Sequence, residues 1–142
     1  MEGKEKGDMK KVLVVGSLNM DMVLSVDHHP VPGETIIGDG ITYHPGGKGA
    51  NQAYAVGKLG GDVRIIGCVG WDNNGMILTE NLAQAGVDTT AINRMPEAPT
   101  GMAIIDVDKK GDNSIIVISG ANACLTPDLL RKQKASVEWS DF

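Results

Sequence analysis

Two continuous apolar runs indicate buried strands. Residues 11–16 (KVLVVG) and 63–69 (VRIIGCV) are rich in β-forming side chains with no polar alternation. That pattern is typical of strands covered on both faces, as in the parallel sheet of an α/β protein. We therefore expect an α/β fold with a partial, Rossmann-like parallel sheet.

Two helices are predicted beside these strands. Residues 50–59 are rich in alanine and stop at a Gly-Gly pair, and residues 76–85 stop before a glycine, which suits left-handed helix caps. The expected apolar face of the second helix consists of Met76, Ile77, Leu82 and Ala83. Strands and helices thus alternate along the first part of the chain.

Other segments are predicted to form shorter strands, some of them in a separate flap. Residues 22–27 and 34–44 show mixed alternation with an Asp-Gly turn signal, which predicts antiparallel strands with one exposed face. Residues 101–108 and 114–119 flank a KKGD turn and predict a hairpin, and residues 89–95 predict one more strand. Thr126 and Pro127 then open a last helix as N-cap and first residue.

Composition narrows the function classes. The 142 residues carry 13 Lys and Arg against 18 Asp and Glu, a net charge of −5, which argues against electrostatic binding of nucleic acid or of a membrane surface. No apolar run approaches the roughly 20 residues of a membrane span. The two cysteines lack metal-binding spacing and are expected to be reduced, which suits a cytoplasmic protein. The charged start of the chain, residues 1–10, is expected to be a flexible tail.

A glycine-rich loop is the densest candidate for chemistry. Gly46, Gly47 and Gly49 surround Lys48 and lead directly into the first predicted helix, where free backbone N–H groups attract ligand oxygens. The loop is not a Walker A motif, because a glycine follows Lys48 and Thr42 stands where that motif needs glycine. The alternative is a tight strand-to-helix connection with Lys48 in solvent.

A second candidate follows the first strand. Asn19 and Asp21 come just after its carboxyl end, the edge at which open α/β sheets bind ligands. Asn19 can donate and accept hydrogen bonds and Asp21 can accept two, so the pair suits a molecule with adjacent hydroxyl groups. An Asx turn at the strand end is an equally good interpretation.

Together these segments resemble the ribokinase-like (PfkB) carbohydrate kinases. The resemblance rests on GSLNMD at 16–21, PGET at 32–35, GGKGANQA at 46–53, and TGMAIIDVD with SIIVISGANA at 100–108 and 114–123. It implies an α/β domain with a small β lid near residues 22–44 and 101–119, and transfer of a phosphoryl group from ATP to the 5-hydroxyl of D-ribose or a similar sugar. Fructokinases and nucleoside kinases share the broader pattern.

The resemblance also assigns residues to the sugar site. It implies that sugar hydroxyls are bound by Asn19, Asp21, Gly46, Gly47, Lys48 and Asn51, and that Ala103 and Ile105 line the apolar side of the pocket. The physical interpretation agrees, since a carboxylate and amides give directed hydrogen bonds to a neutral sugar.

The family's remaining machinery is not in this sequence. The resemblance implies a catalytic aspartate in a GAGD-type segment, together with ATP, Mg²⁺ and K⁺ sites in a C-terminal half, and none of the 142 residues supplies them. We therefore expect residues 11–142 to be the N-terminal part of such a kinase, inactive alone. The alternative is a non-catalytic sugar-binding module or one that forms a homodimer through the lid.

Three histidines and one aspartate are weaker candidates for a functional site. His28, His29 and His44 lack metal-ligand spacing and are expected to be histidines of surface loops. Asp72 follows a strand and is expected to cap the next helix, with no catalytic role.

Overall fold

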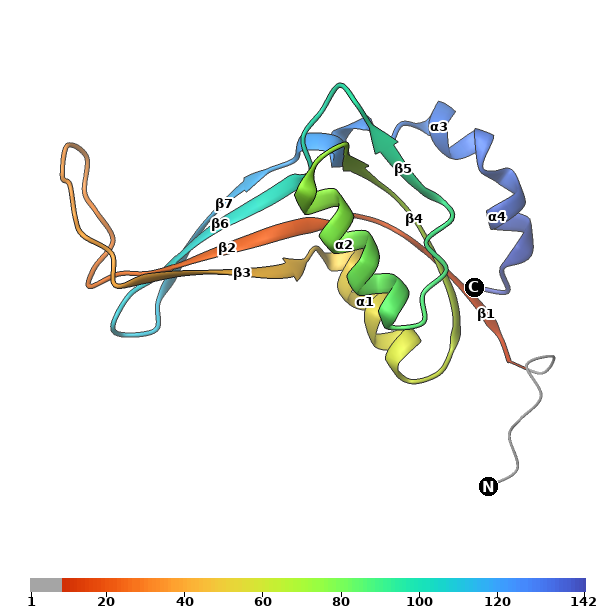
Figure 1. The fold of residues 1–142 in the computed structure, drawn as a ribbon, viewed down its shortest axis with the longest axis horizontal. Helices are drawn as coiled ribbons and strands as arrows, with labels where there is room; N and C mark the ends of the chain where they lie inside the picture. Colours follow the sequence, from red (N-terminus) through yellow and green to blue (C-terminus); the bar gives the residue numbers. More distant parts are fainter. Residues whose placement is uncertain (1–8) are drawn as a thin grey trace.

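A computed structural model describes residues 9–142, so residues 1–8 of the expected N-terminal tail lie outside the described residues. The described residues form two sheets, whose strands alternate along the chain, and four α-helices (Figure 1). The elements are β1 (Lys11–Val15), β2 (Asn19–Ser25), β3 (Gly40–Gly46), α1 (Lys48–Lys58), β4 (Asp62–Gly70), α2 (Asn73–Gln84), β5 (Ile92–Met95), β6 (Gly101–Val107), β7 (Asn113–Ile118), the 3₁₀ helix η2 (Gly120–Cys124), α3 (Pro127–Lys132) and α4 (Lys134–Trp139).

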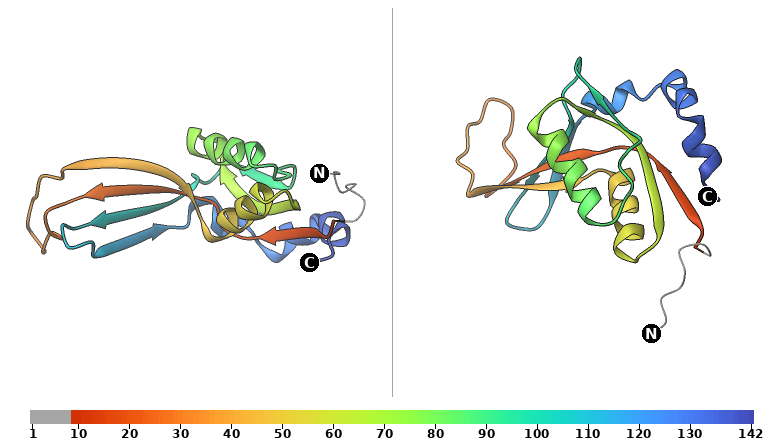
Figure 2. Two further views of the ribbon diagram at one scale, coloured as in Figure 1. Left: turned by 90° about the horizontal axis from the view of Figure 1, so that it is seen from below. Right: turned by 45° about the vertical axis from the view of Figure 1, so that its right-hand side comes forward.

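The first sheet, here the core sheet, has the order β1-β4-β5 with all strands parallel. Helices α1 and α2 lie on one side of it and α3 and α4 on the other (Figure 2). The predicted α/β architecture is confirmed. Within residues 9–142 no helix is long and apolar enough to cross a membrane.

The second sheet, here the lid sheet, has the order β3-β2-β6-β7 and extends away from the helices as an arm (Figure 1). Strands β2 and β6 are parallel, whereas the β2–β3 and β6–β7 pairs are antiparallel. The KKGD hairpin prediction is confirmed. The prediction of strand over residues 34–39 is wrong, because the chain pairs with β2 only from Gly40 onward.

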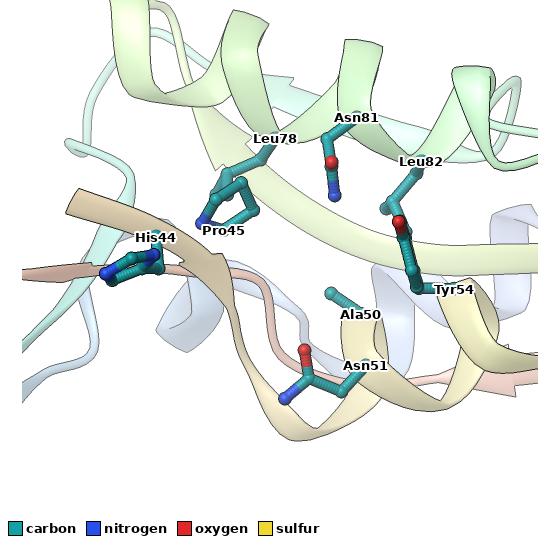
Figure 3. Close-up of a pocket in the computed structure, with 8 residues that line it drawn as sticks. All are labelled: His44, Pro45, Ala50, Asn51, Tyr54, Leu78, Asn81 and Leu82. Atoms are coloured by element: carbon teal, nitrogen blue, oxygen red, sulfur yellow. The ribbon is translucent and has the colours of Figure 1, made fainter.

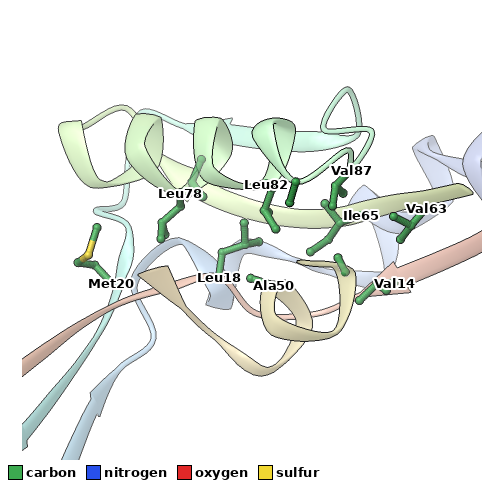
Figure 4. Close-up of a cluster of buried hydrophobic side chains, with 12 residues drawn as sticks. Val14, Leu18, Met20, Ala50, Val63, Ile65, Leu78, Leu82 and Val87 are labelled. Atoms are coloured by element: carbon green, nitrogen blue, oxygen red, sulfur yellow. The ribbon is translucent and has the colours of Figure 1, made fainter. Parts of the chain in front are cut away.

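The core lies between the core sheet and helices α1 and α2 (Figure 4). Leu18 and Ile65 are fully buried there, and Leu82 of α2 is 1% exposed. The predicted apolar face of α2 is otherwise wrong, because Met76 is 47% exposed and Leu78 is buried in its place. The buried positions, Leu78, Leu82 and Ala85, follow one another at spacings of four and three, so the face of the helix that meets the core is rotated away from Met76 and Ile77.

Burial on both faces holds for one of the two predicted strands. The last six residues of β4 are all buried, but Val15 of β1 is 47% exposed. Strand β1 lies at the edge of the core sheet, where its free side contacts the chain end: the Leu13 N–H donates to Phe142 O at 2.7 Å. A long apolar run thus forms a strand here without full coverage.

Candidate functional site

The glycine loop joins the lid sheet to the first helix. Gly47 is the N-cap of α1 with φ of +98°, a left-handed conformation that favours glycine. A Cβ on Gly49 would lie 2.7 Å from Gly16 Cα, so the two backbones touch. The Ala50 N–H also donates to Ser17 O at 3.0 Å. These contacts hold the segment after β1 against the start of α1.

Strand register sets which residues share a face of the lid sheet. Asn19 pairs with Gly46 on β3 and with Gly101 on β6, because residues directly opposite in a ladder point to the same side. Two positions along β2, Asp21 pairs with His44 and Ala103. The expected site residues on this one face are Asn19, Asp21, Gly46, Ala103 and Ile105.

A cavity of about 250 Å³ opens where the two sheets meet. Its lining contains three of the expected residues, Asn19, Gly47 and Lys48, which come from the two motifs. It also contains four that the sequence analysis did not assign: Ser17, Val117, Ser119 and Asn122. The last three belong to the SIIVISGANA segment, so that segment was the signal that could have found them.

Asp21 is not among the residues that line this cavity; it lies two positions from Asn19 on the same face of the lid sheet, against Gly46 of the glycine loop. A Cβ on Gly46 would lie 2.3 Å from Asp21 Oδ2, so a larger residue at position 46 would displace the carboxylate from this place. Partial burial raises the pKa of Asp21, and the nearby His44 opposes that shift. The expectation of a loop position for His44 is wrong, because this residue lies in β3 directly opposite Asp21.

Asn51 lies at a different cavity. This second space, of about 270 Å³, lies between α1, α2 and the end of β3 (Figure 3). Asn51 and Tyr54 come from α1 and Asn81 from α2. The structure therefore separates Asn51 from the cavity of Asn19 and Lys48, and neither Ala103 nor Ile105 lines either cavity.

Asp72 holds α2 against the start of β6. Its Oδ1 accepts from the Gly75 N–H at 2.8 Å and from Thr100 Oγ1 at 2.6 Å, and its Oδ2 accepts from the Thr100 N–H at 2.8 Å. Burial alone would raise the pKa of Asp72, but these hydrogen bonds outweigh it and lower the pKa. The expected helix cap is confirmed.

The histidines and cysteines of the described residues were candidates for metal binding or thiol chemistry. Between residues 9 and 142, no three His, Cys, Asp or Glu side chains are grouped as metal ligands. His28 and His29 lie in the loop after β2, as expected, and contact the carboxylates of Glu34 and Asp106. Both cysteines are free, and burial raises the pKa of Cys68 to about 11.

Known proteins of one family are similar to this chain. The model of the pfkB family carbohydrate kinases matches residues 9–142. The ribokinase of Haemophilus influenzae is 45% identical over 94% of this chain and 44% of its own length. The ribokinase structure from Thermotoga maritima is 44% identical, with a TM-score of 0.81 over 88% of this chain and 41% of that one. The Arabidopsis thaliana ribokinase complexed with ribose and ATP is 35% identical, with a TM-score of 0.74 over 80% and 37%. The chain thus spans less than half the length of these relatives.

Proposed function

The chain belongs to the pfkB family of carbohydrate kinases, and we propose that its residues form the sugar-binding part of a ribokinase-type enzyme. The observation that carries this proposal is the cavity between the two sheets, which Asn19 and Lys48 line, with Asp21 two positions from Asn19 on the same face of the lid sheet. The Arabidopsis relative, whose structure contains ribose and ATP, supports ribose as the sugar.

The polar groups that line the cavity, together with Asp21 on the same sheet face, suit a neutral polyol. A carboxylate at Asp21 accepts hydrogen bonds from two hydroxyl groups, while Asn19 and Lys48 supply donors. Ser17 and Ser119 add hydroxyl groups to the lining, and Val117 adds an apolar surface. Few well-placed polar groups with an apolar wall are typical of small-ligand sites.

The transfer reaction is part of the proposal for the whole enzyme. ATP would supply the phosphoryl group and the 5-hydroxyl of ribose would accept it, a reaction that depends on positioning and on stabilising charge at the phosphates. Mg²⁺ and K⁺ would act in such an enzyme; among residues 9–142 no three His, Cys, Asp or Glu side chains are grouped as metal ligands. We assign no catalytic step to these residues and expect no turnover of ATP by the 142-residue chain.

A homodimer through the lid sheet and a cytoplasmic location complete the proposal. The dimer is supported by exposed apolar residues on β7, where Ile116 and Val117 are each 60% exposed. The cytoplasmic location is supported by the two free cysteines, because thiols stay reduced in the cytosol. Sedimentation equilibrium would show a dimer that Ile116→Lys dissociates, whereas a monomer at all concentrations would contradict the dimer.

Calorimetric titration with D-ribose tests the sugar site. We expect saturable binding that Asp21→Asn weakens about 10- to 100-fold, the factor for a lost charge-assisted hydrogen bond. Asp39→Asn is the matched control, because this aspartate is exposed in the loop before β3, and it should leave the affinity unchanged. No binding by the folded chain, or equal affinity in the Asp21→Asn variant, would contradict the proposal.

A further inference from the structure

Asn122 in η2 makes three side-chain hydrogen bonds at the junction of the two sheets. Its Oδ1 accepts from the Leu18 N–H at 3.0 Å, and its Nδ2 donates to Leu18 O at 3.0 Å. The same Nδ2 donates to Asn19 Oδ1 at 2.8 Å. Asn122 therefore binds both backbone groups of one residue and the side chain of the next.

The two bonds to Leu18 fix the orientation of the Asn122 amide. Exchanging its oxygen and nitrogen would place a carbonyl against Leu18 O and an NH₂ group against the Leu18 N–H, which loses both bonds. Leu18 itself is fully buried in the core, so its backbone cannot shift to follow the exchange. The Asn122 nitrogen is thereby directed at Asn19.

A fixed donor at Asn122 determines the orientation of Asn19 in turn. The Asn19 oxygen faces the Asn122 nitrogen, so the Asn19 NH₂ group is the part of that amide available to a ligand. Packing allows little rearrangement, because a Cβ on Gly101 would lie 2.2 Å from Asn122 Nδ2 and 2.5 Å from Asn19 Oδ1. Both asparagines line the 250 Å³ cavity.

We propose that Asn122 is a positioning residue that holds the Asn19 amide with its NH₂ group directed at an acceptor oxygen of the sugar. The proposal rests on the proposed function, since it takes the cavity to be the sugar site. Without Asn122 the Asn19 amide could present either its oxygen or its nitrogen, and binding would have to select one orientation. Fixing the orientation beforehand removes that cost from binding.

The proposal separates the roles of the two amides in recognition. Asn19 contacts the sugar, whereas Asn122 acts through Asn19 and through the Leu18 backbone. A ligand must therefore offer an oxygen with a free lone pair at this point of the site, which both sugar hydroxyls and a sugar ring oxygen do.

A double-mutant cycle measured by calorimetry with D-ribose tests this coupling. Asn122→Asp keeps the shape and the acceptor for the Leu18 N–H, but it places oxygen against Leu18 O and Asn19 Oδ1. We expect it to weaken ribose binding at least tenfold in the wild-type background and less than twofold in an Asn19→Ala background. Asn113→Asp, at an exposed position on β7, is the matched control and should not change the affinity. Equal losses in both backgrounds would mean a merely structural role and overturn the proposal.

Side-chain NMR of the wild-type chain covers the case in which Asn122→Asp does not fold. Without ligand, the Asn122 NH₂ protons should exchange slowly, because both are hydrogen-bonded. On addition of ribose, the Asn19 NH₂ signals should shift while those of Asn122 stay in place. Shifts at Asn122 alone would contradict the proposal. If ribose does not bind, the proposed function fails, and rapid exchange at Asn122 would separately overturn the positioning role.

Discussion

Ile65 and Ile116 are the same residue type in strands of the two sheets, yet their environments are opposite. Ile65 of the core sheet is 0% exposed, and Ile116 of the lid sheet is 60% exposed. Every residue of β7 is exposed, although the strand reads NSIIVI. A run of apolar residues thus forms the core where helices cover it, and in the lid sheet it forms an open surface instead.

The two sheets are held together by different means. Helices α1 and α2 pack on the core sheet, and burial of apolar side chains stabilises it. The lid sheet relies on backbone pairing between its four strands, so it leaves a face free for a ligand or another chain. The candidate site lies where the two meet, with Asn19 at the start of β2 and Gly47 at the start of α1.

The largest expected difference between the sheets is the effect of removing an isoleucine side chain. Ile65→Ala should lower the free energy of unfolding by about 2–5 kcal/mol, because it leaves a cavity in the core. Ile116→Ala should change the free energy of unfolding of the monomer by less than about 1 kcal/mol, because in the monomer this side chain is in solvent. Urea unfolding measures both, and similar losses would contradict the contrast.

Glycine replacement gives the next largest contrast. Gly49→Ala should cost about 1–3 kcal/mol, because its Cβ would collide with the backbone of Gly16. Gly40→Ala in the lid sheet should cost little, since nothing lies within 4 Å of its Cβ. Thermal unfolding compares the two variants. A tolerated Gly49→Ala would show that the contact between the two motifs is not tight.

Two aspartates make a smaller comparison. Asp72 uses both carboxylate oxygens, so Asp72→Asn should cost about 1–2 kcal/mol. Asp108 in the lid hairpin accepts from the Lys110 and Asp112 N–H groups with one oxygen, and its other oxygen lies 3.7 Å from His29 Nε2. An asparagine side chain keeps the acceptor and loses only the charge interaction with His29, so Asp108→Asn should cost less than about 1 kcal/mol. Urea unfolding at neutral pH measures both effects.

The stabilisation that Asp72 contributes should depend on pH. Its pKa is lowered in the folded chain, so its stabilisation is present above the unfolded pKa of about 3.9 and is lost as pH falls through the folded pKa. The difference between wild type and Asp72→Asn should therefore shrink in acid. A difference that grows on acidification would contradict the sign of this shift.

The smallest expected effect is confined to the loop that joins β2 and β3. A hydrogen bond to Asp106 raises the pKa of His29, and Asp108 and Asp112 add to the shift. The stabilisation is therefore complete below the ordinary pKa of about 6.5 and is lost as pH rises through the raised value. NMR titration of the imidazole checks this. Asp106→Asn should lower the midpoint, and a wild-type midpoint at or below the ordinary value would contradict the contact.

Local chemistry made part of this fold predictable. The KKGD turn brings its own hydrogen bonds, such as the Gly111 N–H to Asp108 O at 3.0 Å, and Thr126 caps α3 as expected by accepting from the Leu129 N–H at 3.2 Å. The error over residues 34–39 has a physical cause: an extended, β-prone sequence forms a strand only if a partner edge is available.

The residues of the candidate site also differ in whether a local sequence signal predicts them. Asn19, Gly47 and Lys48 could be proposed because each stands in a short motif with its own local signal. Asn122 could not, since its role depends on a contact with a residue 103 positions away in the sequence. The separation of Asn51 from this cavity likewise depends on the packing of α1 against α2.

Binding of a sugar at the junction of the two sheets can be observed residue by residue in a backbone amide NMR titration of the 142-residue chain with D-ribose. We predict saturable shifts of the backbone amide signals, concentrated at Asn19, Gly47, Lys48 and Ser119, with α3 and α4 unchanged. Shifts confined to the second cavity, around Tyr54 and Asn81, would contradict the account, as would the absence of any shift in a folded chain.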